Sequence, residues 1–349
     1  GFATPERRVI VDINDLDETL PAPWEWDVKR LGASFVVSAQ EYGIDNEIAK
    51  RVAKVCVRSY RENLRKYSKM SPLKLWYEQL DLSTFAKNAP TKKTRLYREQ
   101  LIKRAETRVA EYLFPKITTE VDGKKRLIDQ PPLMFHHDKD NFEELAKQTI
   151  QDYRKSLPDD RRILMDRYQF EDVVLKVVGI GSVGTRCFVV LLMSPDGEPL
   201  LLQAKEARSS VLEPYAGKSQ YEKHGQRVVV GQRITQSSSD IFLGWARGPE
   251  GKDLYVRQLR DMKVSFSFDE INPIRLETYA KYCGQALARS HAKSGNAAMI
   301  SGYLGKSDVF DEAVSGFAME YAKQNKRDYD ALLDAVRKGE IKAISENNL

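Results

Sequence analysis

The chain has 349 residues and a mass of 39.9 kDa, enough for two or three domains with buried cores. It is 42% hydrophobic and 30% charged, as globular proteins are, and its net charge of +6 is too small to indicate nucleic-acid binding. Three widely spaced cysteines exclude a disulfide framework and a zinc-ligand spacing, and they favour the reducing cytoplasm. No apolar run approaches the about 18 residues of a membrane helix, so neither a membrane nor a nucleic acid is an expected partner.

The N-terminal part of the sequence predicts mainly helices. A short strand from Arg8 to Ile13 runs into an acidic turn, and two helices follow, the first with an apolar i, i+3/i+4 stripe and the second over residues 46–68. Basic helices continue to about residue 113. Asp122-Gly123 is a hairpin-turn signal, and residues 141–157 predict another amphipathic helix.

The sequence pattern changes near Tyr168. Strand-like segments and one predicted helix continue to about Lys263, and helices return after Asp269. We therefore expect an α+β protein with segments at residues 1–165, 166–264 and 265–349, in which a β-rich part lies between two helical parts.

The stretch VVLKVVGIGSVGTRCFVVLLM holds a G-x-G-x-x-G pattern at Gly179, Gly181 and Gly184. A dinucleotide-binding fold requires a helix after these glycines, but the residues that follow predict a strand. A P-loop is excluded because no Gly-Lys-Ser/Thr follows. Strand, glycine loop and strand is the arrangement that lies over ATP phosphates in kinase-like folds, where the loop, here including Ser182, approaches the phosphates. The triplet alone could also mark a tight turn or a bulge.

A kinase-like arrangement predicts a lysine on the third strand, and EPLLLQAKEA carries Lys205 near its end. Such a lysine pairs with α- and β-phosphate oxygens. The sequence leaves its acidic partner open among Glu222, Glu213 and Glu206. The last predicted strand ends between Gln258 and Asp261, where a hinge to a helical lobe would bind adenine through the backbone.

Candidate metal ligands lie near the start of the chain, where VDINDLDET contains Asp12, Asp15 and Asp17 after a predicted strand. A calcium EF-hand is excluded because Asp17 stands where glycine is required and Pro23 where glutamate is required. The segment is either a solvated acidic turn or a site for Mg²⁺, which takes only one or two carboxylates besides phosphate and water.

The histidines favour structural roles. His136 and His137 are neighbours followed by Asp138, but adjacent strand residues point to opposite faces, so a surface or packing role is expected. His291, in HAKSGN, lacks the neighbouring aspartate of a kinase catalytic loop and is expected to cap or pack a helix.

The chain resembles the bacterial DUF2252 family in six segments: VDINDLDETLPAPWEWDVKRLGAS, VVGIGSVGTRCFVVLL, LLLQAKEA, GQRVVVGQRITQSSSDIFLGW, YVRQLRDMK and ALARSHAKSG with ISGYLG. Members of this family are uncharacterised and are assigned to the protein-kinase-like superfamily. The resemblance covers nearly the whole chain and implies a bilobal, kinase-like fold. It also implies a circular permutation, because the metal-binding segment precedes the nucleotide-binding strands.

The resemblance further implies roles for particular residues. INDLDET is similar to a metal-binding strand and turn of phosphotransferases, with Asp15 as the first candidate ligand and Asp17 and Asp12 as the next. Leu16 stands where the family usually has phenylalanine. Asp27 resembles a later aspartate of this pattern, and a helix N-cap is its alternative role. Family members usually carry a G-D-x-H-x-x-N element before GFATPERR, so the catalytic base is expected there.

These observations predict an ATP- and Mg²⁺-dependent phosphotransferase with Lys205 and Asp15 as its catalytic residues. The nucleotide would be bound by Gly179, Gly181, Ser182, Gly184, Lys205 and Gln258. A nucleotide-binding pseudokinase and an enzyme that transfers AMP are the alternatives. The expected partners are a nucleotide and an unknown small-molecule or protein substrate.

Overall fold

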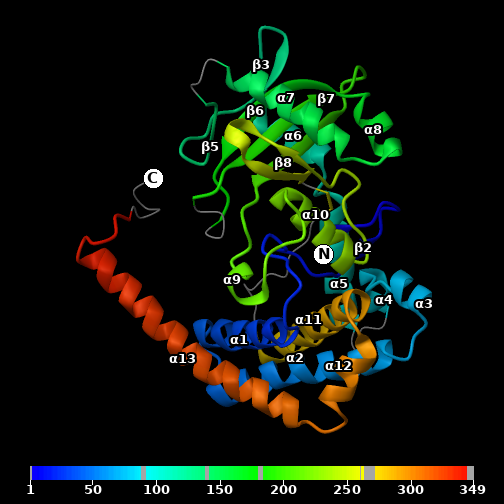
Figure 1. The fold of residues 1–349 in the computed structure, drawn as a ribbon, viewed down its shortest axis with the longest axis vertical. Helices are drawn as coiled ribbons and strands as arrows, with labels where there is room; N and C mark the ends of the chain where they lie inside the picture. Colours follow the sequence, from blue (N-terminus) through cyan, green and yellow to red (C-terminus); the bar gives the residue numbers. More distant parts are fainter. Residues whose placement is uncertain are drawn as a thin grey trace. The chain divides into compact units, whose positions relative to one another are not determined.

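The computed structural model describes residues 2–87, 92–137, 141–179, 184–259, 261–262 and 272–343. It confirms a mixed α+β protein and divides into two compact units (Figure 1). Unit 1 comprises Gly1–Ala22 and Trp76–Phe266, and unit 2 comprises Pro23–Leu75 and Ser267–Leu349. Each unit is therefore assembled from distant parts of the sequence, while the segment boundaries at 165 and 264 stay a prediction.

Unit 1 is built on a six-stranded sheet in the order β5-β6-β7-β8-β10-β9, in which every neighbouring pair is antiparallel. The strands are β5 (Met134–Phe135), β6 (Gln169–Lys176), β7 (Cys187–Met193), β8 (Pro199–Glu206), β9 (Gly244–Arg247) and β10 (Asp253–Gln258). The predicted strands on both sides of the glycine loop are confirmed as β6 and β7. The predicted lysine-bearing strand is confirmed as β8, which pairs with β7.

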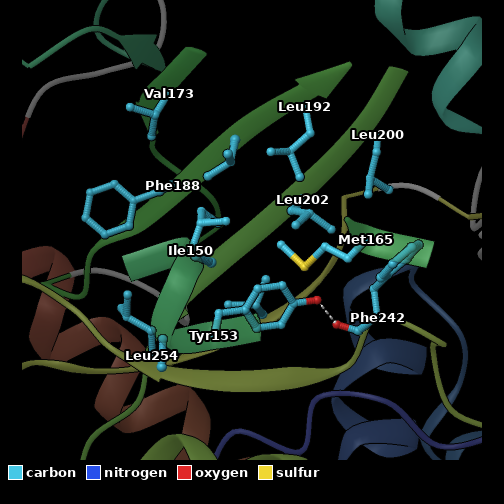
Figure 2. Close-up of a cluster of buried hydrophobic side chains, with 14 of the residues drawn as sticks. Ile150, Tyr153, Met165, Val173, Phe188, Leu192, Leu200, Leu202, Phe242 and Leu254 are labelled. Carbon is cyan, nitrogen blue, oxygen red and sulfur yellow. Dashed lines mark hydrogen bonds between the residues drawn. The ribbon is translucent and has the colours of Figure 1, made fainter. Parts of the chain in front are cut away.

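Helices cover both faces of this sheet, so its inner strands are apolar on both sides. On one face, α7 (Phe142–Lys155) and the end of α8 (Asp159–Met165) pack on β7 and β8 (Figure 2). The other face contacts α6 (Ala110–Ile117), the hairpin β3 (Thr118–Val121) and β4 (Lys124–Leu127), and α10 (His224–Thr235). The predicted hairpin turn is confirmed, because Asp122 and Gly123 have φ angles of 50° and 76°.

The remaining elements of unit 1 are short, apart from the 15-residue helix α5. They are β1 (Phe2–Ala3), β2 (Val9–Ile10), α4 (Leu82–Lys87), α5 (Lys92–Glu106), α9 (Glu213–Ala216) and the 3₁₀ turn η2 (Pro249–Gly251). The predicted strand from Arg8 to Ile13 is shorter than expected. The Val11 N–H donates to the Leu80 carbonyl, and the Ile13 carbonyl accepts from Gln236, so these backbone groups bond outside a strand pair.

Unit 2 is helical. Its helices α1 (Glu25–Glu41), α2 (Asn46–Tyr67), α11 (Pro273–Ser294), α12 (Ala297–Leu304) and α13 (Val309–Arg337) bury their apolar faces against one another (Figure 1). The chain passes from unit 2 to unit 1 within the short helix α3 (Pro72–Tyr77). Gly284 allows α11 to approach α2, because a Cβ there would lie 2.2 Å from the Cys56 carbonyl oxygen.

A buried ion pair joins α2 to α13. Arg61 Nε lies 2.9 Å from Asp311 Oδ1, and Arg61 Nη2 lies 2.7 Å from Asp311 Oδ2. Such a bidentate pair fixes the helices in one orientation and leaves neither buried charge without a partner. Within the described ranges, none of the helices is both long and apolar enough to cross a bilayer.

Tyr153 offers a test of the packing between α7 and the sheet. Its side chain is buried, and its hydroxyl donates to the Phe242 carbonyl (Figure 2). Tyr153→Phe keeps the ring but removes the donor, so the free energy of unfolding should fall by about 1–2 kcal/mol in urea denaturation. Tyr329→Phe, on the exposed side of α13, should change it by less than about 0.5 kcal/mol. Equal losses in the two variants would contradict this role for the Tyr153 hydroxyl.

Candidate functional site

Lys205 lies near the end of β8, on the sheet face that α10 covers. Its cross-strand neighbours are Cys187 on β7 and Tyr255 on β10, and neighbours in register point to the same face. The Lys205 ammonium lies 6.0 Å from the centroid of the Tyr255 ring. With 18% of its side chain exposed, Lys205 is a half-buried cation beside an aromatic ring.

The acidic partner of Lys205 is Asp17, which comes from the N-terminal segment. Asp17 Oδ2 lies 3.7 Å from the Lys205 Nζ, and the Tyr255 hydroxyl donates to Asp17 Oδ1 at 2.7 Å. Burial raises the pKa of Tyr255, so the hydroxyl stays protonated and can donate. The structure thus brings together two residues that the sequence assigned to phosphate and metal binding.

The three glutamates considered as partners of Lys205 lie elsewhere. The Glu206 carboxylate accepts from Arg208 Nε at 2.9 Å, on the opposite side of β8 from Lys205, as strand alternation predicts. Glu213 Oε1 is buried without a hydrogen-bond partner among the described residues. Glu222 is exposed before α10. In the described part of the chain, Asp17 is therefore the ion-pair partner of Lys205.

The three predicted metal ligands lie in different environments. Asp17 faces Lys205, whereas Asp12 Oδ2 accepts from both the backbone N–H and the hydroxyl of Ser237, each at 2.6 Å. Asp15 is exposed, has a φ angle of 63°, and bonds to no described side chain or backbone group. Asp12 therefore anchors the segment to the turn after α10, and Asp15 is open to a ligand.

Within the described ranges, no three His, Cys, Asp or Glu side chains gather as a metal-ligand group. A metal ion at the acidic segment would therefore take one or two carboxylates and complete its coordination with phosphate and water. Mg²⁺ commonly has this kind of coordination. Asp17 and Asp15 are the carboxylates that fit such a role, because Asp12 is occupied by Ser237.

The glycine loop connects β6 to β7, and the structure describes its two ends. Gly179 and Gly184 lie in the described ranges, whereas Gly181 and Ser182 lie outside them. Gly184 has a φ angle of 76°, in the left-handed region where glycine is favoured. The need for glycine at this position is thus explained by backbone conformation, and contact with a nucleotide stays a prediction.

Glu206 fixes the end of the glycine loop to the strand that carries Lys205. Its carboxylate accepts from Arg208 and, at 3.1 Å, from the backbone N–H of Arg186, and Arg208 also donates to the Gly184 carbonyl. Burial of Glu206 opposes ionisation, but these bonds outweigh it and lower the pKa of Glu206 below its ordinary value of 4.5.

Gln258, the predicted adenine-binding residue, ends β10. Its backbone N–H donates to Asp240 Oδ2 at 2.7 Å, and its Nε2 donates to Asp240 Oδ1 at 3.1 Å. Burial raises the pKa of Asp240, and the bonds from Gln258 and Phe242 oppose this effect. The N–H of Gln258 is thus occupied by Asp240, and its role in adenine binding stays a prediction.

Two residues of the site were not predicted. Tyr255 lies directly opposite Lys205, a placement that a correct pairing of the last predicted strand with the lysine-bearing strand would have given. Arg227 is 3% exposed and lies in α10, where its Nη1 donates to the Thr19 carbonyl at 2.6 Å. The sequence signal for Arg227 was a charged residue directly before the apolar run VVV of a helix.

The histidines have the structural roles that were expected. His136 lies between two carboxylates, 2.8 Å from Asp129 Oδ1 and 3.0 Å from Asp172 Oδ2, which ties the loop before β5 to β6. In unit 2, His291 lies 2.8 Å from the Tyr60 hydroxyl and 3.1 Å from Asp27 Oδ2. The N-cap position of α1 is occupied by Trp24, so the N-cap role considered for Asp27 is wrong.

The fold and the site define an α+β protein in which a lysine of the antiparallel sheet pairs with an aspartate of the N-terminal acidic segment. The chain belongs to the DUF2252 family, described as an uncharacterized protein conserved in bacteria, whose model matches residues 1–335. The family resemblance is thereby confirmed. The chain matches no curated protein and no solved structure.

Glu206→Gln should destabilise the protein by about 1.5–3 kcal/mol at neutral pH, because two bonds to a charged acceptor are weakened. Since the folded pKa lies below 4.5, the contribution of the carboxylate is complete above about pH 4.5 and is lost as the pH falls through the folded pKa. Urea denaturation at pH 7 and pH 3.5 should therefore give a smaller difference between wild type and variant at pH 3.5. A difference that does not change with pH would argue against this role of the Glu206 carboxylate. The control is Glu143→Gln, at an exposed position.

The variants Asp12→Asn and Asp15→Asn distinguish the carboxylate that anchors the acidic segment from the carboxylate that is exposed. The first should lower the free energy of unfolding by about 1–2 kcal/mol, because Asp12 accepts from Ser237 at Oδ2 and from the Ile13 N–H at Oδ1, and an amide has only one accepting oxygen. The second should change it by less than about 0.5 kcal/mol, since asparagine tolerates a positive φ and Asp15 is exposed. Chemical denaturation of both variants in the absence of metal checks the difference, and equal effects would refute it.

Proposed function

We propose that this protein binds ATP with Mg²⁺ in unit 1 and transfers a phosphoryl group, on a kinase-like, bilobal fold with a circularly permuted chain order. The observation that carries the proposal is the ion pair between Lys205 and Asp17. Lys205 lies on the central strand β8, and Asp17 lies in the acidic segment, far from Lys205 in the sequence. The glycine loop connects β6 to β7, and β7 pairs with the lysine-bearing strand β8, which is the strand order of kinase-like nucleotide-binding lobes.

The ion pair suggests how a nucleotide and a metal ion would enter the site. ATP phosphates would replace the Asp17 carboxylate at Lys205, and Mg²⁺ would take the released carboxylate. Each charge exchanges one partner for another, so neither is left unpaired in a half-buried position. Asp15, two residues from Asp17 and exposed, can supply a second carboxylate. Catalysis would then consist of positioning and charge neutralisation.

The order of the segments supports a permuted kinase-like chain. The acidic segment precedes every strand of the main sheet, yet its carboxylates contact distant parts of the chain. Asp17 contacts β8 and β10, and Asp12 contacts the turn after α10. In the kinase-like arrangement a metal-binding aspartate likewise faces the lysine of the sheet. The family resemblance of INDLDET and LLLQAKEA points to the same two roles.

Nucleotide binding is tested with Lys205→Met. Isothermal calorimetry with ATP and Mg²⁺ should give a dissociation constant at least about tenfold higher than for wild type, because the phosphates lose their cation; tenfold is about 1.4 kcal/mol. Lys252→Met makes the same charge change at an exposed position of unit 1 and should bind as wild type does. A wild-type protein that neither binds ATP nor gains thermal stability from it would refute the proposal, as would equal affinities of the two variants.

Labelled ATP then distinguishes the reaction classes. Transfer of the γ-label by the full-length protein to an acceptor in a bacterial extract supports phosphoryl transfer. Transfer of the α-label instead identifies an enzyme that transfers AMP. Binding without transfer of either label identifies a nucleotide-binding pseudokinase.

A further inference from the structure

The side chain of Arg227 connects α10 to two other parts of unit 1. Its Nη1 donates to the Thr19 carbonyl at 2.6 Å. Its Nη2 donates to the carbonyls of both Asp17, at 2.9 Å, and Arg208, at 2.8 Å. The guanidinium is therefore held by three backbone carbonyls.

The two carbonyls that share Nη2 belong to the segments whose side chains form the ion pair. Asp17 supplies the carboxylate, and Arg208 lies three residues after Lys205, just beyond the end of β8. A single nitrogen thus fixes the separation between the acidic segment and the lysine-bearing strand. A lysine could not reproduce this arrangement, because its ammonium lacks the planar fork of donors.

Other residues of α10 hold the same acidic segment. A Cβ on Gly231, one turn after Arg227, would lie 2.2 Å from Thr19 Cγ2, so the segment packs directly on the helix backbone. At the end of the helix, Gln236 Nε2 donates to the Ile13 carbonyl at 3.0 Å. The segment is therefore fixed along its length, while Arg227 also reaches the strand of Lys205.

The burial of Arg227 carries a cost. Desolvation lowers the pKa of Arg227, and the nearby carboxylates of Glu18, Glu213 and Asp17 oppose this effect. A buried charge is weak as a source of stability, because desolvation consumes much of what its bonds contribute. The three carbonyl bonds therefore point to a role in geometry.

We propose that Arg227 is a positioning residue that sets the separation of Asp17 and Lys205. This inference rests on the proposed function, since these are the two groups that would meet Mg²⁺ and phosphate. When Arg227 is replaced, the acidic segment moves away from β8 and Lys205 loses its carboxylate partner. The nucleotide would then bind with less help from Mg²⁺.

The proposal can be tested without nucleotide by measuring how fast an amine-reactive acetylating reagent modifies Lys205. Peptide mass spectrometry gives this rate, and the exposed Lys252 is the internal reference. Asp17→Asn defines the rate for an unpaired Lys205. Arg227→Lys should raise the rate several-fold toward this value. Arg233→Lys is the matched control, because Arg233 lies in the same helix and donates to the Leu243 carbonyl instead of the acidic segment.

Gly231→Ala provides a second variant that keeps the buried charge. Its methyl group should push Thr19 and the acidic segment from the helix and raise the Lys205 rate as Arg227→Lys does. Wild-type rates in both variants would overturn the proposal, and so would an equal rise in Arg233→Lys, which would indicate general loosening of α10. Thermal denaturation identifies any variant that does not fold, and the other variant then decides.

The link to function is measured as the ratio of ATP dissociation constants in EDTA and in Mg²⁺. Arg227→Lys should reduce this ratio by about tenfold relative to wild type, and Arg233→Lys should leave it unchanged within about twofold. An unchanged ratio in Arg227→Lys would overturn the positioning role. If wild type binds no ATP in either condition, the proposed function fails, while the acetylation result still decides whether Arg227 positions the pair.

Discussion

The contact between α10 and the acidic segment is the interaction on which the site of unit 1 depends. Residues 12–19 form no regular element of their own, so their position is set by their neighbours. Arg227 and Gln236 hold the backbone of this segment, and Ser237 holds Asp12. Without these bonds, nothing in the local sequence would keep Asp17 beside Lys205.

The sheet contributes a second constraint, because alternation along β8 sends neighbouring side chains to opposite faces. Lys205 faces the acidic segment, whereas Glu206 on the other side fixes the end of the glycine loop. Two adjacent residues thus connect the strand to two different loops. The strand that carries them, β8, is itself buried between two layers of helices.

Local sequence patterns predicted the helices and strands, whereas contacts between distant segments determine the arrangement of the candidate site. The strands around the glycine loop and the helices of unit 2 followed from periodicity and turn residues, which depend on short stretches of chain. The pairing of Lys205 with Asp17 could not be predicted in this way, because it depends on a segment that packs far from its neighbours in sequence. For the same reason, the predicted strand after Arg8 was too long: Val11 and Ile13 bond to Leu80 and Gln236, which no local pattern reveals.

The interleaving of the two units imposes an order on folding during synthesis. The helices α1 and α2 leave the ribosome about 200 residues before α11, which at roughly 5–20 residues per second is about 10–40 seconds. For that interval α2 lacks the close contact that Gly284 of α11 makes at Cys56, and the α1–α2 pair presents apolar surface. The six strands of the main sheet are all synthesised within the same interval. Unit 2 is therefore completed last, and a chain released before α11 is made would expose α1 and α2 without their partner helix.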